Sequence, residues 1–187
     1  MKALMTLALA GAVFAGPAFA EPVTKTVTRD GVKYDSTRTI VRDKDAGTVS
    51  RDASVTRASD GAVAVRSYDR AKTETGVTAS GSQTGFNGKT SSFEFERTKT
   101  ENGSTSSGTA TGPNGGTLNY TGSRERTDNG FTASQSVVNG QGRSLYDRNV
   151  VQTRVDGNVS RSVDVTRAAG FHPKRVIGAH LPGRRHR

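Results

Sequence analysis

The stretch VTASGSQTGFNGKTSSFEFERTKTENG at residues 77–103 is followed by STSSGTATGPNGGTLNYTGSRERTDNG at 104–130 and FTASQSVVNGQGRSLYDRNVVQTRVDG at 131–157. The three units have the same length and agree at a threonine, a serine two places on, a mid-unit glycine and a closing glycine. A fixed period of this size is typical of repeat architectures, in which each unit is one supersecondary element. The period therefore predicts a repeat architecture but does not indicate a ligand or a reaction.

Within each unit, alternating residues indicate two strands joined by a turn. Hydroxyl side chains occupy every second position in the first half of the first unit, at Thr78, Ser80, Ser82 and Thr84. A two-residue period is that of a β-strand, and threonine fits a pleated surface well. Turn residues such as those at 85–88 separate the halves, and Asn-Gly or Asp-Gly pairs close the units. Such pairs supply the positive φ angles of tight turns, so each unit is predicted to be a β-hairpin.

The same alternation continues outside the repeats with looser spacing. Further strands are predicted at residues 23–29, 32–41, 48–57, 62–73 and 158–167, and helix-period stretches are absent. The predicted fold class is all-β, an antiparallel up-and-down meander of about eleven strands built from hairpin repeats. A parallel β-solenoid with one unit per turn of the coil is the alternative, although its corners would not need tight hairpin turns.

The composition leaves little material for a hydrophobic core. The chain has 187 residues, no cysteine and no tryptophan. After residue 20, Leu, Ile, Val and Phe make up 28 of the remaining 167 residues, whereas Ser and Thr make up 41. Such a low apolar content favours disorder unless backbone pairing, repetition or a partner supplies stability, and no disulfide can help. A second alternative is therefore that the chain is disordered until it binds a partner or self-assembles.

The N-terminus has the layout of a secretory signal. Residues 1–20 contain one lysine, a largely apolar run, a Gly-Pro pair and a small-residue ending. This pattern predicts cleavage after Ala20, and the run is too short and interrupted for a retained membrane helix. We expect a signal peptide at 1–20, a β-repeat domain at 21–170 and a basic, extended tail at 171–187. The mature chain is expected in the periplasm or outside the cell, without a transmembrane span.

The excess of positive charge is greatest at the C-terminal end. The whole chain has a formal net charge of +10; residues 21–157 hold 19 basic and 16 acidic residues, whereas residues 158–187 hold 7 and 1. A basic tail would attach electrostatically to an anionic envelope or extracellular polymer. Because Phe171 is the only aromatic residue in the tail, no specific nucleic-acid partner is predicted. The candidate polyanion-binding residues are Lys174, Arg175, Arg184, Arg185 and Arg187.

Two further patterns lie within the repeats. The aligned hydroxyls predict an array on one face of the sheet that could bind a sugar polymer or ice, unless they are ordinary polar residues of an exposed face. The members of this hydroxyl array are Thr78, Ser80, Thr105, Ser107, Thr132 and Ser134. Charged residues of both signs, such as Glu94, Glu96 and Arg97, stand close together and are expected to form cross-strand ion pairs.

No catalytic, cofactor-binding or metal-binding residues are predicted. The three histidines, His172, His180 and His186, all follow the last predicted strand, and the chain has no cysteine. The repeats therefore lack the Ser-His-Asp and Cys-His arrangements of nucleophilic catalysis. The histidine spacings of eight and six residues match no compact metal site. We therefore predict a protein that is not an enzyme and needs no cofactor.

Two short motifs resemble known repeat families. The TGPNG motif at residues 111–115 resembles repeats of exported Thr/Gly-rich bacterial proteins, a likeness that covers about half of the mature chain and implies no particular function. Residues 83–86 are similar to the start of the Gln-x-Gly-x-Gly-Asn-x-Ala element of curlin, whose repeats form secreted amyloid fibres. Asn87-Gly88 stand where that element has Gly-Asn.

The expected function follows from these patterns together. The sequence predicts an exported, non-enzymatic β-repeat protein that presents surface or builds structure, tethered by its basic tail to an anionic envelope or extracellular polymer. Self-assembly into a fibre or matrix is the alternative, because strand edges and Thr/Ser/Gly-rich repeats permit it.

Overall fold

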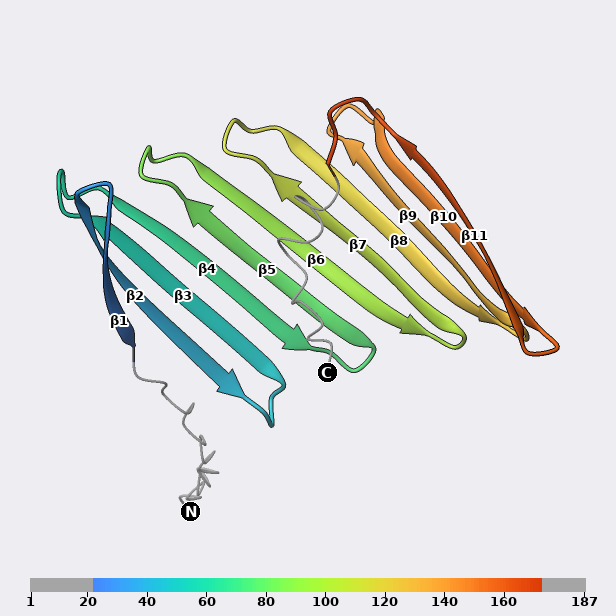
Figure 1. Ribbon diagram of the computed structural model, residues 1–187. Helices are drawn as coiled ribbons and strands as arrows, with labels where there is room; N and C mark the ends of the chain where they lie inside the picture. Colours follow the sequence, from blue (N-terminus) through green and yellow to red (C-terminus); the bar gives the residue numbers. More distant parts are fainter. Residues whose placement is uncertain (1–21, 173–187) are drawn as a thin grey trace, which may run out of the picture.

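Alternating strands and short turns fold residues 22–172, the part of the chain that the computed structural model describes, into one antiparallel sheet (Figure 1). The predicted meander is confirmed, and the solenoid is excluded because all ten strand pairings are antiparallel and join sequence neighbours. The predicted signal peptide and residues 173–187 of the predicted tail lie outside the described residues. The strands are β1 Val23–Arg29, β2 Val32–Asp43, β3 Thr48–Arg57, β4 Val63–Lys72, β5 Gly76–Thr84, β6 Thr90–Thr100, β7 Gly103–Thr111, β8 Thr117–Thr127, β9 Gly130–Asn139, β10 Ser144–Val155 and β11 Asn158–Arg167.

Two connections form tight turns by the mechanism that the sequence predicts. Asp30 and Gly31, between β1 and β2, have φ angles of 51° and 75°. Asp156 and Gly157, between β10 and β11, have φ angles of 50° and 81°. Two successive positive φ angles are the requirement of a type I′ hairpin turn, and their twist matches that of the flanking strands.

The glycines that close the first two repeat units have a different role from the predicted one. Gly103 and Gly130 are the first residues of β7 and β9 and have no positive φ. A Cβ atom on Gly103 would lie 1.8 Å from the carbonyl oxygen of Arg124, and one on Gly130 would lie 1.8 Å from that of Gln152. The prediction of a tight-turn role is wrong here, because the repeated requirement is a close approach of two backbones.

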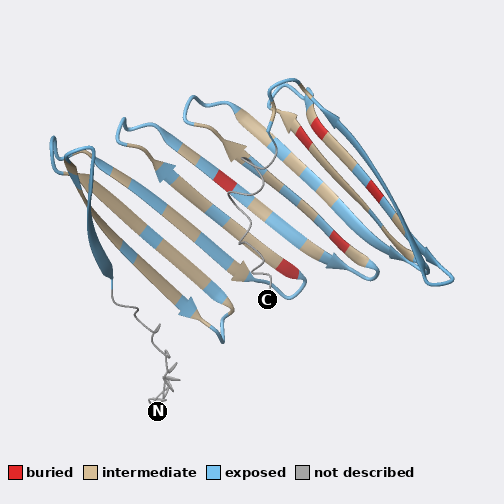
Figure 2. Cartoon of the chain, in the orientation of Figure 1, coloured by how far each residue is buried: buried red, intermediate tan, exposed pale blue. Residues whose placement is uncertain are grey.

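The core is a thin layer on one face of the sheet. Figure 2 shows few buried residues, and the strand register places the five buried side chains on the same face. Large side chains there lie over small ones: Phe93 stands opposite Gly81 on β5 and Ala110 on β7. The buried side chains are Phe93, Ser104, Val137, Tyr146 and Val150.

Aromatic rings on this face contact one another across neighbouring strands. The ring centroids of Phe95 and Tyr120 lie 6.1 Å apart, although Gly108 of β7 stands between them in the register. The rings of Tyr68 and Phe93 lie 6.3 Å apart across Gly81 in the same way. Tilted pairs of this kind stabilise a fold by about 0.5–1.5 kcal/mol beyond their buried area.

The sheet is bent toward this aromatic face. Figure 1 shows the edge strands β1 and β11 in front of the middle strands. Tyr34 on β2 lies 6.1 Å from Phe86 in the turn after β5, and the guanidinium of Arg57 lies 5.0 Å from the Phe86 ring. The Tyr34–Phe86 contact spans β3 and β4, and the Arg57–Phe86 contact spans β4, so the sheet is concave on this face at the end where they occur.

Candidate functional site

Charged side chains are sorted by sign between the two faces of the sheet. Tracing the register from strand to strand puts seventeen cationic strand residues, and no acidic one, on the face that carries the core; we call it the arginine face. Fourteen of these cations are exposed, and Arg51, Arg57 and Arg148 are half-buried. The seventeen are Lys25, Arg29, Arg38, Arg42, Arg51, Arg57, Arg66, Arg70, Lys72, Arg97, Lys99, Arg124, Arg126, Arg148, Arg154, Arg161 and Arg167.

The opposite face, which we call the hydroxyl face, carries the acidic residues among many serines and threonines. All nine acidic strand residues point to it, together with a single cation, Lys33. The nine are Asp35, Asp43, Asp52, Asp69, Glu94, Glu96, Glu125, Asp147 and Asp164.

The predicted cross-strand ion pairs are wrong because neighbours in the sequence point to opposite faces of a strand. Glu96 lies on the hydroxyl face and Arg97 on the arginine face, and the same holds for Asp147 and Arg148. Within residues 22–172, the ion pairs that reach the arginine face join Arg29 to Asp30 and Arg57 to Asp60. Both aspartates belong to turns, and within residues 22–172 the other fifteen cations of the arginine face form no ion pair with a carboxylate.

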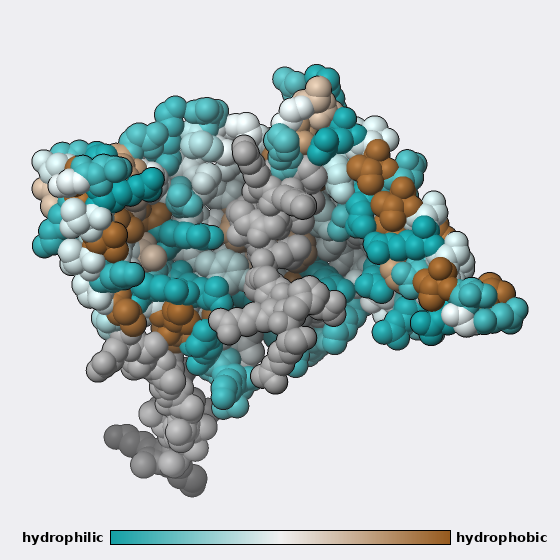
Figure 3. Space-filling view, viewed as in Figure 1, coloured by the Kyte–Doolittle hydropathy of each residue, from teal (hydrophilic) through white to brown (hydrophobic). Residues whose placement is uncertain are grey.

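The cations are spread over the arginine face. No cation stands directly opposite another on an adjacent strand; Lys72 and Arg97, for example, are separated by Val77. Lys99 and Arg124 are separated by Ser104 in the same way. Cations on alternate strands in one row are therefore about 9.5 Å apart at the backbone. Figure 3 shows hydrophilic and apolar residues interspersed on this side of the molecule.

Several arginines are held in place by uncharged neighbours. The guanidinium of Arg124 lies 4.1 Å from the Phe131 ring centroid, and that of Arg51 lies 5.4 Å from the Tyr68 centroid. Arg97 donates hydrogen bonds of 3.2 Å and 3.0 Å, from Nε and a terminal nitrogen, to the Ser104 hydroxyl. These contacts orient the cations without neutralising them.

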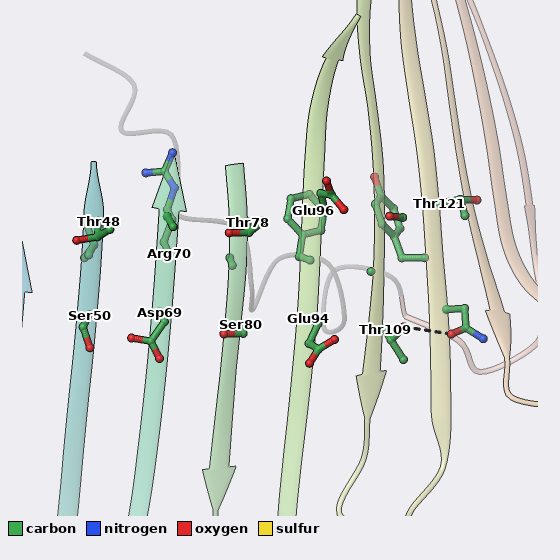
Figure 4. Close-up of a pocket in the computed structure, with 18 of the residues that line it drawn as sticks. Thr48, Ser50, Asp69, Arg70, Thr78, Ser80, Glu94, Glu96, Thr109 and Thr121 are labelled. Carbon is green, nitrogen blue, oxygen red and sulfur yellow. Dashed lines mark hydrogen bonds between the residues drawn. The ribbon is translucent and has the colours of Figure 1, made fainter. Parts of the chain in front are cut away.

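The hydroxyl face contains an open groove across β2 to β8 (Figure 4). Its volume is about 780 Å³, and Thr48, Thr78, Glu94 and Thr109 are among its lining residues. Because a twisted sheet is saddle-shaped, each face is hollow along one diagonal. The groove therefore follows from the twist and from the short side chains of the middle strands.

The six residues of the predicted hydroxyl array all lie on the hydroxyl face but do not form one uninterrupted row. Ser134 shares a 2.8 Å hydrogen bond with Ser123, which also stands opposite Thr105. Between Thr78 and Ser107, however, stands Glu96. The array is thus a mixed hydroxyl and carboxylate surface, and its sugar-binding role stays a prediction.

Two aspartates have depressed pKa values. Hydrogen bonds from Arg57, at 2.8 Å and 2.5 Å, lower the pKa of Asp60 to about 2. Hydrogen bonds from Ser144 and Ser136 lower the pKa of Asp147. Both effects stabilise a charged carboxylate: Asp60 lies in the turn after β3 and pairs with Arg57 of the arginine face, whereas Asp147 lies on the hydroxyl face.

The functional surface that the structure suggests differs from the predicted one. The candidate tail residues Lys174, Arg175, Arg184, Arg185 and Arg187 lie outside the described residues. Net charge summed along the sequence does not reveal the arginine face, because the two signs nearly balance over residues 21–157. The signal was present in the alternation: in residues 93–99, FEFERTK, acidic and basic positions differ in parity. Phe171 is the first residue of the predicted tail, yet its ring contacts the sheet: the ring centroids of Phe171 and Tyr146 lie 6.5 Å apart.

Among residues 22–172, no group of three or more potential metal ligands occurs, and no helix is long and apolar enough to cross a membrane. Comparisons with protein-family models, curated proteins and solved structures yield no match to the chain. The resemblances to TGPNG-type repeats and to curlin therefore stay predictions.

Proposed function

We propose that this protein is an exported, non-enzymatic scaffold whose arginine face binds a linear anionic polymer of the envelope or the extracellular space. The observation that carries the proposal is the separation of charge: seventeen cations and no carboxylate from the strands share one face. A surface of one sign raises the local concentration of ions of opposite sign and accelerates their binding.

Arginine suits this role because its planar guanidinium donates paired hydrogen bonds to carboxylate, sulfate or phosphate groups. Fourteen of the seventeen cations are arginines and three are lysines. Aromatic and hydroxyl neighbours already position Arg97 and Arg124, which lowers the entropy lost when they bind an anion.

A flexible polymer fits this surface better than a flat lipid bilayer does. The bend of the sheet makes the arginine face hollow, so a planar surface would reach the edge strands before the middle ones. A chain can follow the hollow and contact cations on successive alternate strands, about 9.5 Å apart. The basic tail would add further contacts as a tether.

The test uses the mature chain and dextran sulfate as the probe, with binding measured by calorimetry at increasing salt. In the face variant, Arg70→Gln, Arg97→Gln and Arg124→Gln remove three cations from the arginine face. In the matched control, Lys44→Gln, Lys89→Gln and Arg143→Gln remove three exposed cations from loops and turns, so both variants have the same net charge.

We expect the face variant to bind about threefold to 150-fold more weakly, given about 0.2–1 kcal/mol for each of three exposed pairs, and the control to bind nearly as well as the wild type. Equal losses in both variants would overturn the proposal, because net charge alone would then explain binding. Deleting residues 173–187 measures the contribution of the tail to binding separately and leaves Phe171 in place. Binding to anionic vesicles but not to dextran sulfate would point to a membrane instead.

A further inference from the structure

Strand β11 leaves one edge of the sheet unpaired. All ten of its residues are exposed, and within residues 22–172 the one strand that pairs with it is β10. The N–H of Ala168, just after the strand, donates to the carbonyl of Leu145 at 2.9 Å. Because backbone groups alternate along an antiparallel ladder, the odd-numbered residues of β11 direct their N–H and C=O groups away from the sheet. Such an edge is a template for another strand.

Exposed valines gather at this edge. Five of the ten exposed large apolar side chains belong to the β10–β11 hairpin, with exposed fractions of 47–59%. Three of them, Val159, Val163 and Val165, lie on β11 and point to the arginine face. The other two are Val151 and Val155, on the hydroxyl face of β10.

The other edge of the sheet is less suited to pairing. Strand β1 has seven residues against ten in β11. Pro22 immediately precedes it and has no N–H to donate. Short strands and edge prolines are devices that prevent edge pairing, and lysine is another, present at Lys25. The two edges therefore differ, and β11 is the one left open.

We propose that two copies of this chain pair antiparallel through β11, around a two-fold axis that passes between Ser162 and its counterpart in the second copy. In this register, Val159 stands opposite Val165 of the second copy and Arg161 opposite its Val163. No like charges face each other directly. If one copy were shifted by two residues in one direction, Val159 and Val165 would each stand opposite an arginine of the second copy. A shift in the other direction would place Arg161 opposite Arg161 of the second copy. Apolar cross-strand pairs and charge therefore select this register.

Pairing of this kind closes on itself, because the same strand serves on both sides of the axis. It also keeps the two arginine faces on the same side of a continuous sheet. A polymer long enough to span both copies would bind with an increased apparent affinity through effective concentration. The pairing itself goes beyond polymer binding and does not depend on it.

The register can be tested with single cysteines, since the chain has none of its own. With Ser162→Cys, the two Cα atoms across the axis would be about 4.5 Å apart, as in a non-hydrogen-bonded pair. This is within the range of about 4.4–6.8 Å that a disulfide accepts. With Ser160→Cys, a matched control on the same strand and face, the two sites would be about 14 Å apart along the strand.

We expect a covalent dimer from oxidised Ser162→Cys and a monomer from Ser160→Cys on a non-reducing gel. Light scattering of the mature chain should give a dimer without polymer. Val163→Lys sets a lysine opposite Arg161 of the second copy and should raise the dissociation constant at least about tenfold. Val27→Lys on β1, where the exposed fraction is 45% against 47% at Val163, should leave it unchanged. A monomeric wild type, equal crosslinking at both cysteines or equal weakening by both lysines would overturn the proposal.

Discussion

Replacing Gly103 with alanine is expected to destabilise the sheet strongly. The new Cβ would lie 1.8 Å from the carbonyl oxygen of Arg124, whereas an ordinary carbon–oxygen contact is about 3.3 Å, so the backbones must separate by about 1.5 Å. That movement breaks the 2.7 Å hydrogen bond from the Arg126 N–H to the Asn102 carbonyl, which costs about 1 kcal/mol. Residual strain of about 2 kcal/mol brings the expected loss to about 3 kcal/mol.

The measurement is thermal and urea unfolding of the mature chain, followed by circular dichroism. A loss of about 3 kcal/mol lowers the melting temperature by about 6–12 °C in a domain of this size. Gly116→Ala is the control, because nothing lies within 4 Å of its new Cβ and the φ of Gly116 is not positive. This control should be neutral or stabilising by up to about 1 kcal/mol. Equal stability of the two variants would refute the close-approach explanation.

Two further predictions concern the core and a turn. Val137 is fully buried at 0% exposure, so Val137→Ala should cost about 2 kcal/mol in urea unfolding; a loss below about 0.5 kcal/mol would show that this site is not core. Because Arg57 lowers the pKa of Asp60 to about 2, below its unfolded value, Asp60 stabilises the fold above about pH 4 and loses this effect as the pH falls toward 2. The free energy of unfolding, measured from pH 5 to 2, should therefore decrease less steeply for Asp60→Asn than for the wild type. Parallel pH curves for the two proteins would contradict this.

The strand pattern could be predicted from the sequence because alternation and turn residues are local properties. Asp156-Gly157 specifies its own turn, and the strand at 158–167 begins where that turn ends. The role of Gly103 could not be predicted in this way, because the atom that excludes a Cβ belongs to Arg124, twenty-one residues later.

Predicting the arginine face requires both the alternation of residues along each strand and the register between strands. Alternation alone shows that Glu96 and Arg97 point to opposite sides of β6. Only the register shows that Arg97 and Arg124 share a side, because it follows the chain through β7 to β8. The bend of the sheet, which Tyr34 and Phe86 reveal, results from packing between strands that are distant in the sequence.

The strict order of β1 to β11, in which each strand contacts its sequence neighbours, makes the molecule a series of similar interfaces. Such a series can change in length without a change of design. Duplication of one 27-residue unit would insert two strands and widen the arginine face by about 9.5 Å, with no new kind of contact. The number of units thus sets the width of the arginine face, and with it the length of polymer that the proposed binding could cover.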